Sequence, residues 1–409
     1  MIPQGYKHTE LGIIPQEWQV RRLGDLCHNN GDYGINAPAV EYSPTLPTYL
    51  RITDIDTEGR FTRQNISSVN HKDCELYILA DGDIVFARTG ATVGKTYLYD
   101  SRDGDLVYAG FLIKFSPNQK LLIPYYLKTY TETSAYWNWV KVVSQRSGQP
   151  GINSTEYCNL QIPVPPVEEQ RRIAEILGVW DKAIELQARL VDKLELRKRA
   201  LMQRLLTGRL RLPGFSDQWQ KVPINSFAKE ISIKNKKNEP LEVLSCTKYN
   251  GLVSSLEYFG KQIYSNDLRT YKIVPYNHFA YATNHIEEGS IGYQNIMDRA
   301  LISPMYTVFC TDIKIVNDTF LFMLLKTHHL IYLYCSRMEG SIDRRGGLRW
   351  ESFSSIKINI PSLAEQTAIA EVLTTADKEI EIAKARLAAY RTQKRGLMQQ
   401  LLTGKKRVK

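Results

Sequence analysis

The chain has 409 residues, 43% of them hydrophobic, and carries a formal net charge of +10 from 53 basic and 43 acidic side chains. This length exceeds a single ordinary core and predicts roughly two to four domains, while the basic balance favours a polyanionic partner. Six cysteines without a C-x-x-C pair argue against a disulfide framework and a closed zinc site. With no apolar run near the ~20 residues of a membrane span and no signal-peptide core, we expect a cytoplasmic protein.

The first globular segment, residues 1–163, alternates short apolar runs with turns. Runs rich in valine, isoleucine and aromatic residues, broken by glycine, asparagine and aspartate, are typical of strands. Such runs predict strands over 49–55, 83–87, 96–99 and 111–115. Residues 124–143 have helical character, so we expect an α+β fold.

The next segment, residues 164–208, is predicted to be one long helix. Within this segment the helix starts after a proline-rich stretch (Pro163, Pro165 and Pro166) and stops at Thr207-Gly208, which are suitable start and stop signals. Its apolar residues recur every 3.5 residues on average, a spacing that favours a supercoiled helix pair. At 1.5 Å per residue the helix is ~60 Å long.

The second half of the chain repeats this plan. Residues 209–360 again predict an α+β segment, and residues 361–409 predict a second long helix that ends at Thr403-Gly404. Strands are predicted over 243–246, 278–282 and 306–310, and a helical stretch over 320–336. The basic run 405–409 at the end is more typical of a disordered tail than of a specific reader.

The two long helices are copies of one another. Residues 169–208 and 365–404 align without a gap at an offset of 365 − 169 = 196 and are identical at 19 of 40 positions. About two or three identities would be expected by chance. Trp18 and Trp219, each after a proline-containing turn, open the two globular segments. The chain is therefore a pseudo-two-fold internal repeat.

Each helix has a heptad seam that we expect to face the other helix in an antiparallel coiled coil. The predicted seam comprises Ile173, Leu177, Trp180, Ile184, Val191, Leu194, Leu201 and Leu205 in the first copy, and Ile369, Leu373, Ile380, Leu387, Tyr390, Leu397 and Leu401 in the second. An intramolecular pair is favoured over homodimerisation because the second helix is always present at high effective concentration. Lys198 and Lys394 occupy one shared seam position. They either extend to the rim or fix register and orientation.

Several segments resemble catalytic motifs but lack a required residue. The stretch 90–96 (GATVGKT) has three residues between its glycines where a phosphate-binding loop has four. The prolines of 164–167 lack the amide and the aromatic ring of an adenine methyltransferase motif. His328-His329 and the other histidines have no spacing that supplies three metal ligands. Acidic pairs such as Glu287-Glu288 lack a D-x-K nuclease pattern, and Glu168-Glu169 suits a helix's first turn. The sequence thus predicts no catalytic and no metal site.

Loops with basic and small polar residues precede each long helix and are candidate DNA readers. Arginine can bind guanine, glutamine and asparagine can bind adenine, and glycines permit a close approach to a groove. The alternative is a solvated basic loop that holds phosphates. The candidates are Gln145, Arg146, Ser147, Gln149 and Asn153 in the first loop, and Arg344, Arg345 and Arg349 in the second. The turn Lys248-Tyr249-Asn250 is a further, weaker candidate.

At this point the pattern resembles the specificity subunits of Type I restriction-modification enzymes, along essentially the whole chain. The segments that carry the resemblance are IP..W at 14–18 with LGDL at 23–26, DGDIVFARTGATVGK at 81–95, IPVPP at 162–166 with Glu169-Gln170 and Ile173-Ala174, and LMQRLLTG at 201–208 followed by PGF at 213–215. Their combination is specific, although no single piece is.

The resemblance implies a recognition protein without a catalytic site of its own. The two globular segments, hereafter head 1 (residues 1–163) and head 2 (residues 209–360), would be α/β target-recognition domains that each read half of a bipartite double-stranded DNA target. The helices over 164–208 and 361–409 would form an antiparallel spacer that docks two methyltransferase subunits, and motor-nuclease subunits would join them. This chain would bind no cofactor, whereas S-adenosylmethionine, ATP and Mg are expected in the partner subunits.

The resemblance also implies further DNA-binding residues. In head 1 these are Arg88, Thr89 and Lys95, in a loop that would also offer backbone N–H groups to DNA. Head 2 departs from the pattern and has Thr283, Asn284 and His285 opposite the Arg88 stretch. The two half-sites should therefore differ.

The helix length bounds the spacing of the two half-sites. At ~3.4 Å per base pair, ~60 Å corresponds to roughly 17 base pairs. Two rival hypotheses remain at this stage: a two-headed scaffold that binds proteins with the helices as struts, and a self-contained nuclease or methyltransferase.

Overall fold

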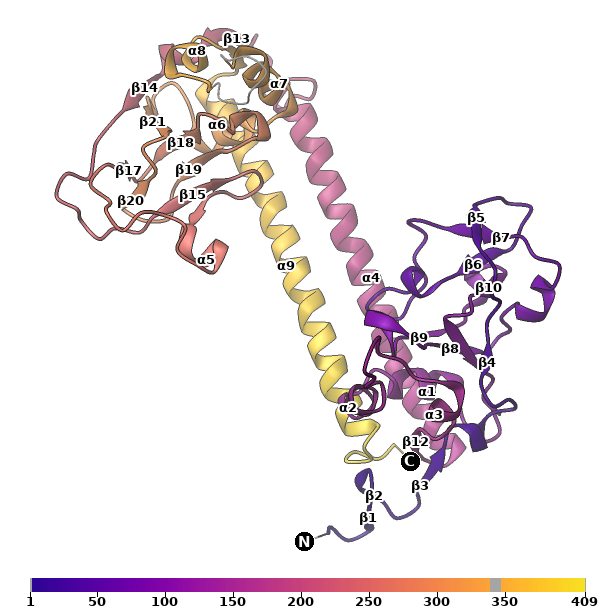
Figure 1. Cartoon of the computed structure of the whole chain (residues 1–409). Coiled ribbons are helices and arrows are strands. Elements are labelled where there is room, and N and C mark those ends of the chain that lie inside the picture. The colour runs from indigo at the N-terminus through magenta and orange to yellow at the C-terminus, as the bar shows by residue number, and fades with distance from the viewer. Residues whose placement is uncertain (1, 339–346, 409) are drawn as a thin grey trace. The chain divides into compact units, whose positions relative to one another are not determined.

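The computed structural model describes residues 2–338 and 347–408, which form two compact units (Figure 1). Unit 1 comprises residues 1–188 and 385–409, and unit 2 comprises residues 189–384. The division falls within both long helices, α4 (Val167–Leu205) and α9 (Leu363–Leu401). Each unit therefore combines one head with part of both helices, whereas the sequence suggested heads and helices as separate segments.

Head 1 consists of short strands followed by three short helices. The strands are β1 (Tyr6–Thr9), β2 (Gly12–Pro15), β3 (Gln19–Arg22), β4 (Asp32–Tyr33), β5 (Ala39–Glu41), β6 (Thr48–Leu50), β7 (Ser67–Val69), β8 (Ile84–Ala87), β9 (Thr96–Leu98), β10 (Leu106–Tyr108), β11 (Leu112–Phe115) and β12 (Gln161–Val164). The helices are α1 (Pro124–Tyr130), α2 (Ser134–Val143) and α3 (Ser154–Cys158).

Head 2 has the same mixture of elements. Its strands are β13 (Gln220–Pro223), β14 (Ala228–Ile231), β15 (Leu244–Thr247), β16 (Gly251–Ser254), β17 (Lys272–Pro275), β18 (His278–Ala282), β19 (Ile291–Gln294), β20 (Arg299–Ile302), β21 (Tyr306–Thr311) and β22 (Lys357–Ile360). Its helices are α5 (Ser255–Phe259), α6 (Asp318–Leu325), α7 (His328–Arg337) and α8 (Trp350–Ser354).

The two heads share one sheet topology. The central antiparallel sheet has the order β4-β11-β8-β9 in head 1 and β14-β21-β18-β19 in head 2. In each head the strand before the long helix pairs antiparallel with the strand that opens the head, β12 with β3 and β22 with β13. The heads differ outside this frame, because head 1 adds the sheet β10-β6-β7-β5 and head 2 has the pairs β15-β16 and β17-β20. The predicted duplication and α+β class are confirmed.

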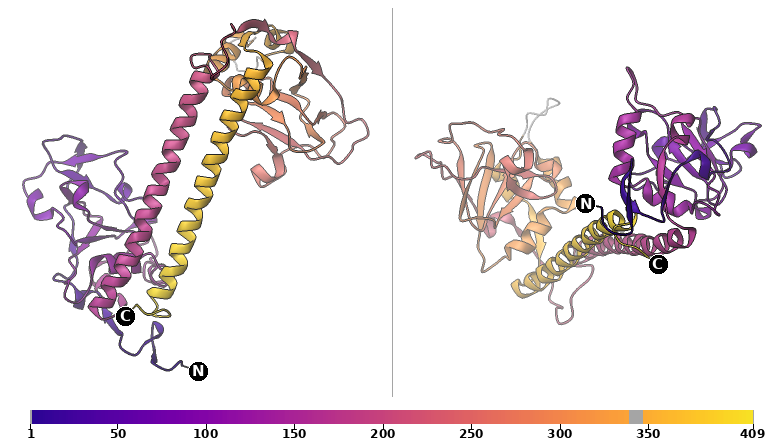
Figure 2. Two further views of the ribbon diagram at one scale, coloured as in Figure 1. Left: turned by 180° about the vertical axis from the view of Figure 1, so that it is seen from behind. Right: turned by 90° about the horizontal axis from the view of Figure 1, so that it is seen from below.

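The helices lie side by side within each unit and run antiparallel (Figure 2). In unit 2, Glu195 on α4 pairs with Lys384 on α9, and Lys198 pairs with Asp377. The residue later in α4 thus pairs with the residue earlier in α9, as expected for antiparallel helices. In unit 1 the Trp180 and Tyr390 rings meet edge to face. All the predicted seam residues are buried or half-buried, and the predicted antiparallel coiled coil is confirmed.

Each head packs its core onto one beginning and one end of the long helices. In unit 1, Ile173 near the start of α4 and Leu401 at the end of α9 join the main head core. In unit 2, Ile369 near the start of α9 and Leu205 at the end of α4 do the same. Since these side chains are almost fully buried, the helix ends are part of the head cores rather than separate struts.

Three predicted elements differ from the structure. Only the first part of 49–55 is a strand, since the Asp54 carboxylate accepts hydrogen bonds from the Arg51 backbone and guanidinium (2.9 and 2.8 Å) and closes a 3-10 turn. The helical stretch 124–143 is split into α1 and α2, because Thr133 caps a new helix by accepting from the Tyr136 N–H. The stretch 320–336 is split in the same way into α6 and α7.

Candidate nucleic-acid interface

In head 1 the structure brings the Arg88 loop against the loop that precedes α3. The Ile152 N–H donates to the Arg88 carbonyl, and the Gly90 N–H donates to the Pro150 carbonyl, both at 2.9 Å. Thr89 and Gly151 form an isolated antiparallel bridge. Two stretches that the sequence singled out separately therefore form one surface.

Head 2 repeats this junction with different side chains. The Leu348 N–H donates to the Thr283 carbonyl at 2.8 Å, as Ile152 does to Arg88. A Cβ on Gly151 would lie 3.4 Å from the Arg88 carbonyl oxygen, and one on Gly347 would lie 3.3 Å from the Thr283 oxygen. The two glycines thus lie at equivalent distances from the backbone of the facing loop. Thr283 is thus the structural counterpart of Arg88.

Arg88 itself is oriented by an aromatic ring. Its guanidinium lies 4.9 Å from the centroid of the Tyr33 ring, and the Tyr33 hydroxyl accepts a hydrogen bond from the Ser154 N–H (3.1 Å). Stacking on an aromatic face limits the rotamers of an arginine without neutralising its charge. Arg88 is therefore positioned to bind an acceptor. Tyr33 was not among the sequence candidates, because it is far from Arg88 in the chain and no local motif marks it.

The other candidates in head 1 divide into residues that shape the loop and residues that project from it. Arg146 donates to both Glu156 carboxylate oxygens at 2.6 Å and to the Val143 and Gln145 carbonyls. Asn153 caps α3 through its side-chain oxygen. The Arg146 guanidinium and the Asn153 side-chain oxygen thus both form hydrogen bonds within the protein. Gln145, Ser147 and Gln149 are exposed on the loop that these residues hold.

The stretch 90–96 is a turn and not an anion-binding loop. The N–H groups of Gly90, Val93, Gly94 and Lys95 all donate to carbonyls within the head. The expectation that this loop offers backbone N–H groups to DNA is wrong for these four amides. The Lys95 ammonium donates to the Ile55 carbonyl at 3.3 Å.

In head 2 the candidate turn 248–250 connects β15 to β16 and lies beside the loop after β18. The Tyr249 side chain is 81% exposed, and the Lys248 ammonium lies 5.3 Å from its ring centroid. A Cβ on Gly289 would lie 3.6 Å from the Lys248 carbonyl oxygen. The turn is held by Lys326, which donates to that carbonyl at 2.9 Å. Lys326 was missed because only the fold brings it to this turn.

The loop 283–289 also brings together three side chains that no sequence motif links. His285, Glu287 and Glu288 place ligand atoms within 4.8 Å of one another, a grouping that no sequence spacing indicated. His285 and Glu288 are both more than half exposed. Two carboxylates repel phosphates, so a DNA contact by this loop would favour base edges over the backbone. Asn284 precedes the group and is half-buried.

The second basic loop is only partly described. Arg344 and Arg345 lie outside the described residues. Arg349 stands at the N-cap of α8, next to Leu348 and the Thr283 junction.

The two seam lysines make equivalent ion pairs across the helix pair. The Lys394 ammonium lies 2.7 Å from an Asp181 oxygen, and Lys198 pairs with Asp377. Both partners are related by the 196-residue offset (377 − 181 = 394 − 198 = 196). Since the same pair forms twice, these residues fix register and orientation, which is the sharper of the two explanations raised by the sequence.

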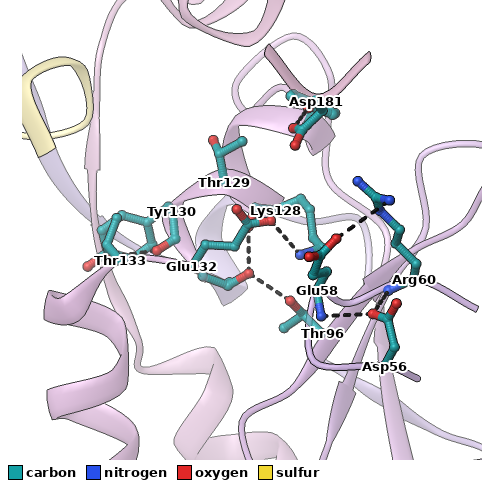
Figure 3. A network of polar contacts seen from close by, with 12 residues as sticks. Asp56, Glu58, Arg60, Thr96, Lys128, Thr129, Tyr130, Glu132, Thr133 and Asp181 are labelled. Atoms are coloured by element: carbon teal, nitrogen blue, oxygen red, sulfur yellow. Dashed lines mark hydrogen bonds and ion pairs between the residues drawn. The ribbon is translucent and has the colours of Figure 1, made fainter. Parts of the chain in front are cut away.

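In unit 1 this pair continues into head 1 through Glu132, whose contact with Lys128 is shown in Figure 3. Glu132, at the end of α1, binds the ammonium groups of Lys128 (2.8 Å) and Lys394 (3.0 Å). Burial alone would raise the pKa of Glu132, but the two ammonium groups outweigh it and hold that pKa below its ordinary value. Glu58, beside Arg60, pairs with Arg391 at 2.6 Å. Head 1 is thereby bound to α9 by charge as well as by its core.

The basic tail is not a disordered end over its described part. Arg407 binds Glu169 at 2.7 Å and Glu17 at 2.6 Å, and Glu169 also accepts the Trp18 indole N–H (3.0 Å). In unit 2 the equivalent pair is Arg211 with Glu365, again offset by 196. Glu169 thus does more than complement a helix dipole.

Comparison with known proteins gives a consistent result. The family described as Type I restriction modification DNA specificity domain matches residues 15–196 and 217–389. The Type I restriction enzyme MjaVIII specificity subunit of Methanocaldococcus jannaschii is 24% identical over 100% of this chain and 99% of that protein.

Two solved structures share the fold. One is described as "Structural basis underlying complex assembly and conformational transition of the type I R-M system" (17% identity, TM-score 0.55, 96% of this chain and 99% of that chain). The other is the S subunit of a Type I restriction-modification system from M. genitalium (13% identity, TM-score 0.56, 94% and 96%). Within the described part of the chain, no helix is long and apolar enough to cross a membrane.

Proposed function

The chain belongs to the Type I restriction modification DNA specificity family, and from this premise we propose that its two heads read the two halves of a split double-stranded DNA target. One observation carries the proposal: the heads share a sheet order and a loop junction, yet place Arg88 in one and Thr283 in the other at that junction. A common frame with different side chains suits the reading of two different half-sites.

The helix pair is the proposed spacer and docking element. It would fix the separation of the half-sites and bind two methyltransferase subunits, which motor-nuclease subunits would join. S-adenosylmethionine, ATP and Mg would be bound by those partners, and this chain would supply recognition alone. In support, four amides of the stretch that resembles a phosphate-binding loop, those of Gly90, Val93, Gly94 and Lys95, donate to carbonyls within the head.

The direct test is per-base methylation mapping of a host genome with and without this chain. The expected result is a split motif with a modified adenine in each half, lost when the chain is deleted. Arg88→Ala should relax or weaken one half only, and Thr283→Ala the other. Unchanged methylation after deletion of the chain would reject the proposal.

Salt dependence separates DNA reading from a scaffold role. Counterion release predicts that log K falls linearly with log salt, with a slope of roughly −5 if about six phosphates are contacted. A scaffold that binds proteins would show no such slope with duplex DNA. The purified chain alone should leave DNA unmodified.

A further inference from the structure

Each head carries a large apolar side chain on a tight turn that leads into an inner strand of its central sheet, β11 in head 1 and β21 in head 2. In head 1 the turn runs from Ala109 to Leu112, closed by the Leu112 N–H donating to the Ala109 carbonyl (2.8 Å). In head 2 it runs from Ser303 to Tyr306, closed by the equivalent bond (3.1 Å). The third residue of the turn is Phe111 in head 1 and Met305 in head 2.

Both side chains project into solvent from a fixed backbone. Phe111 is 57% exposed and Met305 is 61% exposed. The head 1 turn is also tied to the preceding loop, because the Gly110 N–H donates to the Ile35 carbonyl (2.8 Å) and the Gly34 N–H to the Leu112 carbonyl (3.1 Å). Scattered exposed apolar residues are ordinary on a protein surface. Phe111 and Met305 differ from such scattered residues in that they occupy the same turn position in heads whose turn sequences differ (AGFL and SPMY).

Each turn is bonded directly to the residue at the candidate DNA-reading junction. The Arg88 N–H donates to the Phe111 carbonyl at 3.0 Å. The Thr283 hydroxyl donates to the Met305 carbonyl, also at 3.0 Å. A duplex that reaches Arg88 or Thr283 therefore meets the neighbouring apolar side chain as well.

We propose that Phe111 and Met305 are wedges that insert between neighbouring base pairs, one in each half of the target. The inference rests on the proposed function of the heads as DNA readers. Phe and Met are among the apolar side chains that proteins use to unstack a base step. Unstacking next to the reading junction would make a sequence-dependent deformation part of recognition, because pyrimidine–purine steps open more readily than others. It would also lower the cost of taking an adenine out of the stack for methylation.

The test uses the full chain with its partner subunits and a duplex bearing the target found by methylation mapping. Adenines near each half-site are replaced one at a time by 2-aminopurine, whose fluorescence rises when it is unstacked. The variants are Phe111→Ser and Met305→Ser, with Phe111→Leu as the conservative change. Leu11→Ser, on the β1–β2 hairpin, and Ile313→Ser, beyond the other end of β21, are matched controls on exposed apolar residues.

The expected result is a fluorescence rise at one step in each half-site with the unchanged protein. Phe111→Ser should abolish the rise in one half and weaken binding by about tenfold, and Met305→Ser should do so in the other half. Phe111→Leu and the two controls should keep it. A mismatch at the same step should restore binding to the serine variants, since the base pair is then already weakened.

Two outcomes would overturn the wedge. One is specific binding by the unchanged protein with no unstacking at any step. The other is binding by both serine variants that equals the controls. Absence of any salt-dependent, sequence-specific binding by the unchanged protein would instead remove the proposed function itself. Circular dichroism melting of each variant separates a misfolded head from a missing wedge.

Discussion

The short link between α1 and α2 in head 1 and the link between α6 and α7 in head 2 have the same local hydrogen bonding but bind different parts of the protein. In head 1 the Thr133 hydroxyl donates to the Tyr130 carbonyl (2.7 Å), and in head 2 the Thr327 hydroxyl donates to the Leu324 carbonyl (2.8 Å). The residues that precede these two threonines carry opposite charges. It is Glu132 in head 1 and Lys326 in head 2.

The opposite charges bind different elements. Glu132 binds Lys394 of α9 and so fastens head 1 to the helix pair. Lys326 donates to the Thr247 and Lys248 carbonyls and fastens the exposed turn of Tyr249 to the body of head 2. Burial lowers the pKa of the Lys326 ammonium. The duplicated backbone is thus the same in both heads, while one position serves to anchor the head in head 1 and to hold an exposed turn in head 2.

The largest expected effect is a loss of stability on replacing the buried glutamine that both halves of the chain share. Gln170 and Gln366 are fully buried, and each makes two hydrogen bonds to its head, such as the one from the Ile123 N–H to Gln170 (2.9 Å), and a third to the proline that precedes its long helix. Gln170→Ala and Gln366→Ala should each lower the unfolding free energy of their unit by about 3 kcal/mol, because buried partners lose their bonds. Calorimetry of the full chain checks this.

The exposed pair Gln203 and Gln399, related by the same offset, supplies controls. Gln203→Ala and Gln399→Ala should change stability by less than about 0.5 kcal/mol. A much larger loss in one unit than in the other for the buried pair would break the claim that the frame is equivalent in both halves.

A smaller and unequal effect is expected at the seam lysines. Lys394 is 10% exposed between two carboxylates, whereas Lys198 is 22% exposed beside one. Lys394→Ala should cost unit 1 about 2 kcal/mol, because the partly buried Glu132 and Asp181 lose the ammonium that they share, and Lys198→Ala should cost unit 2 less than about 1 kcal/mol. Hydrogen exchange of peptides from α1 and α9 measures the difference.

The exposed lysines 182 and 378 are the matched controls for this pair. Lys182→Ala and Lys378→Ala remove the same charge from the same helices without touching the seam. Equal protection losses in Lys394→Ala and Lys198→Ala would contradict the inferred asymmetry.

The smallest effect should fall on DNA binding by head 2 alone. Lys326→Met keeps the apolar stem and removes the two bonds that hold the 248–250 turn. We expect about fivefold weaker binding to a duplex that matches only the second half-site. This loss corresponds to about 1 kcal/mol, the free energy of one hydrogen bond between the displaced turn and DNA. Glu132→Gln, the counterpart in head 1, should leave that affinity unchanged. A loss with Glu132→Gln as large as with Lys326→Met would contradict separate roles.

The sequence was sufficient for the frame because the frame is repeated. A fixed offset and a 3.5-residue spacing predicted α4, α9 and their seam, since both signals are local or periodic. The strands that end just before Arg88 and Thr283, β8 and β18, were also predictable, because β-branched and aromatic runs mark buried strands.

The interface could be predicted only in part, because it depends on contacts between distant segments. The pairing of Arg88 with Tyr33 joins residues 55 positions apart (88 − 33 = 55) that no motif links. The loop sequence predicts Arg146 as a DNA reader, but in the fold its guanidinium pairs with the Glu156 carboxylate. The tail was expected to be disordered because its sequence carries charge alone, whereas buried Glu169 gives Arg407 a partner.

The spacer role of the paired helices is tested most directly by lengthening both. Seven residues inserted after Ala188 and seven after Lys384 would preserve the heptad seam in both strands of the coil. At 1.5 Å per residue the insertion adds about 10 Å, so methylation mapping should find the same two half-sites with a gap wider by about 3 base pairs. Methylation of both half-sites at the original gap would show that the helices do not set the distance.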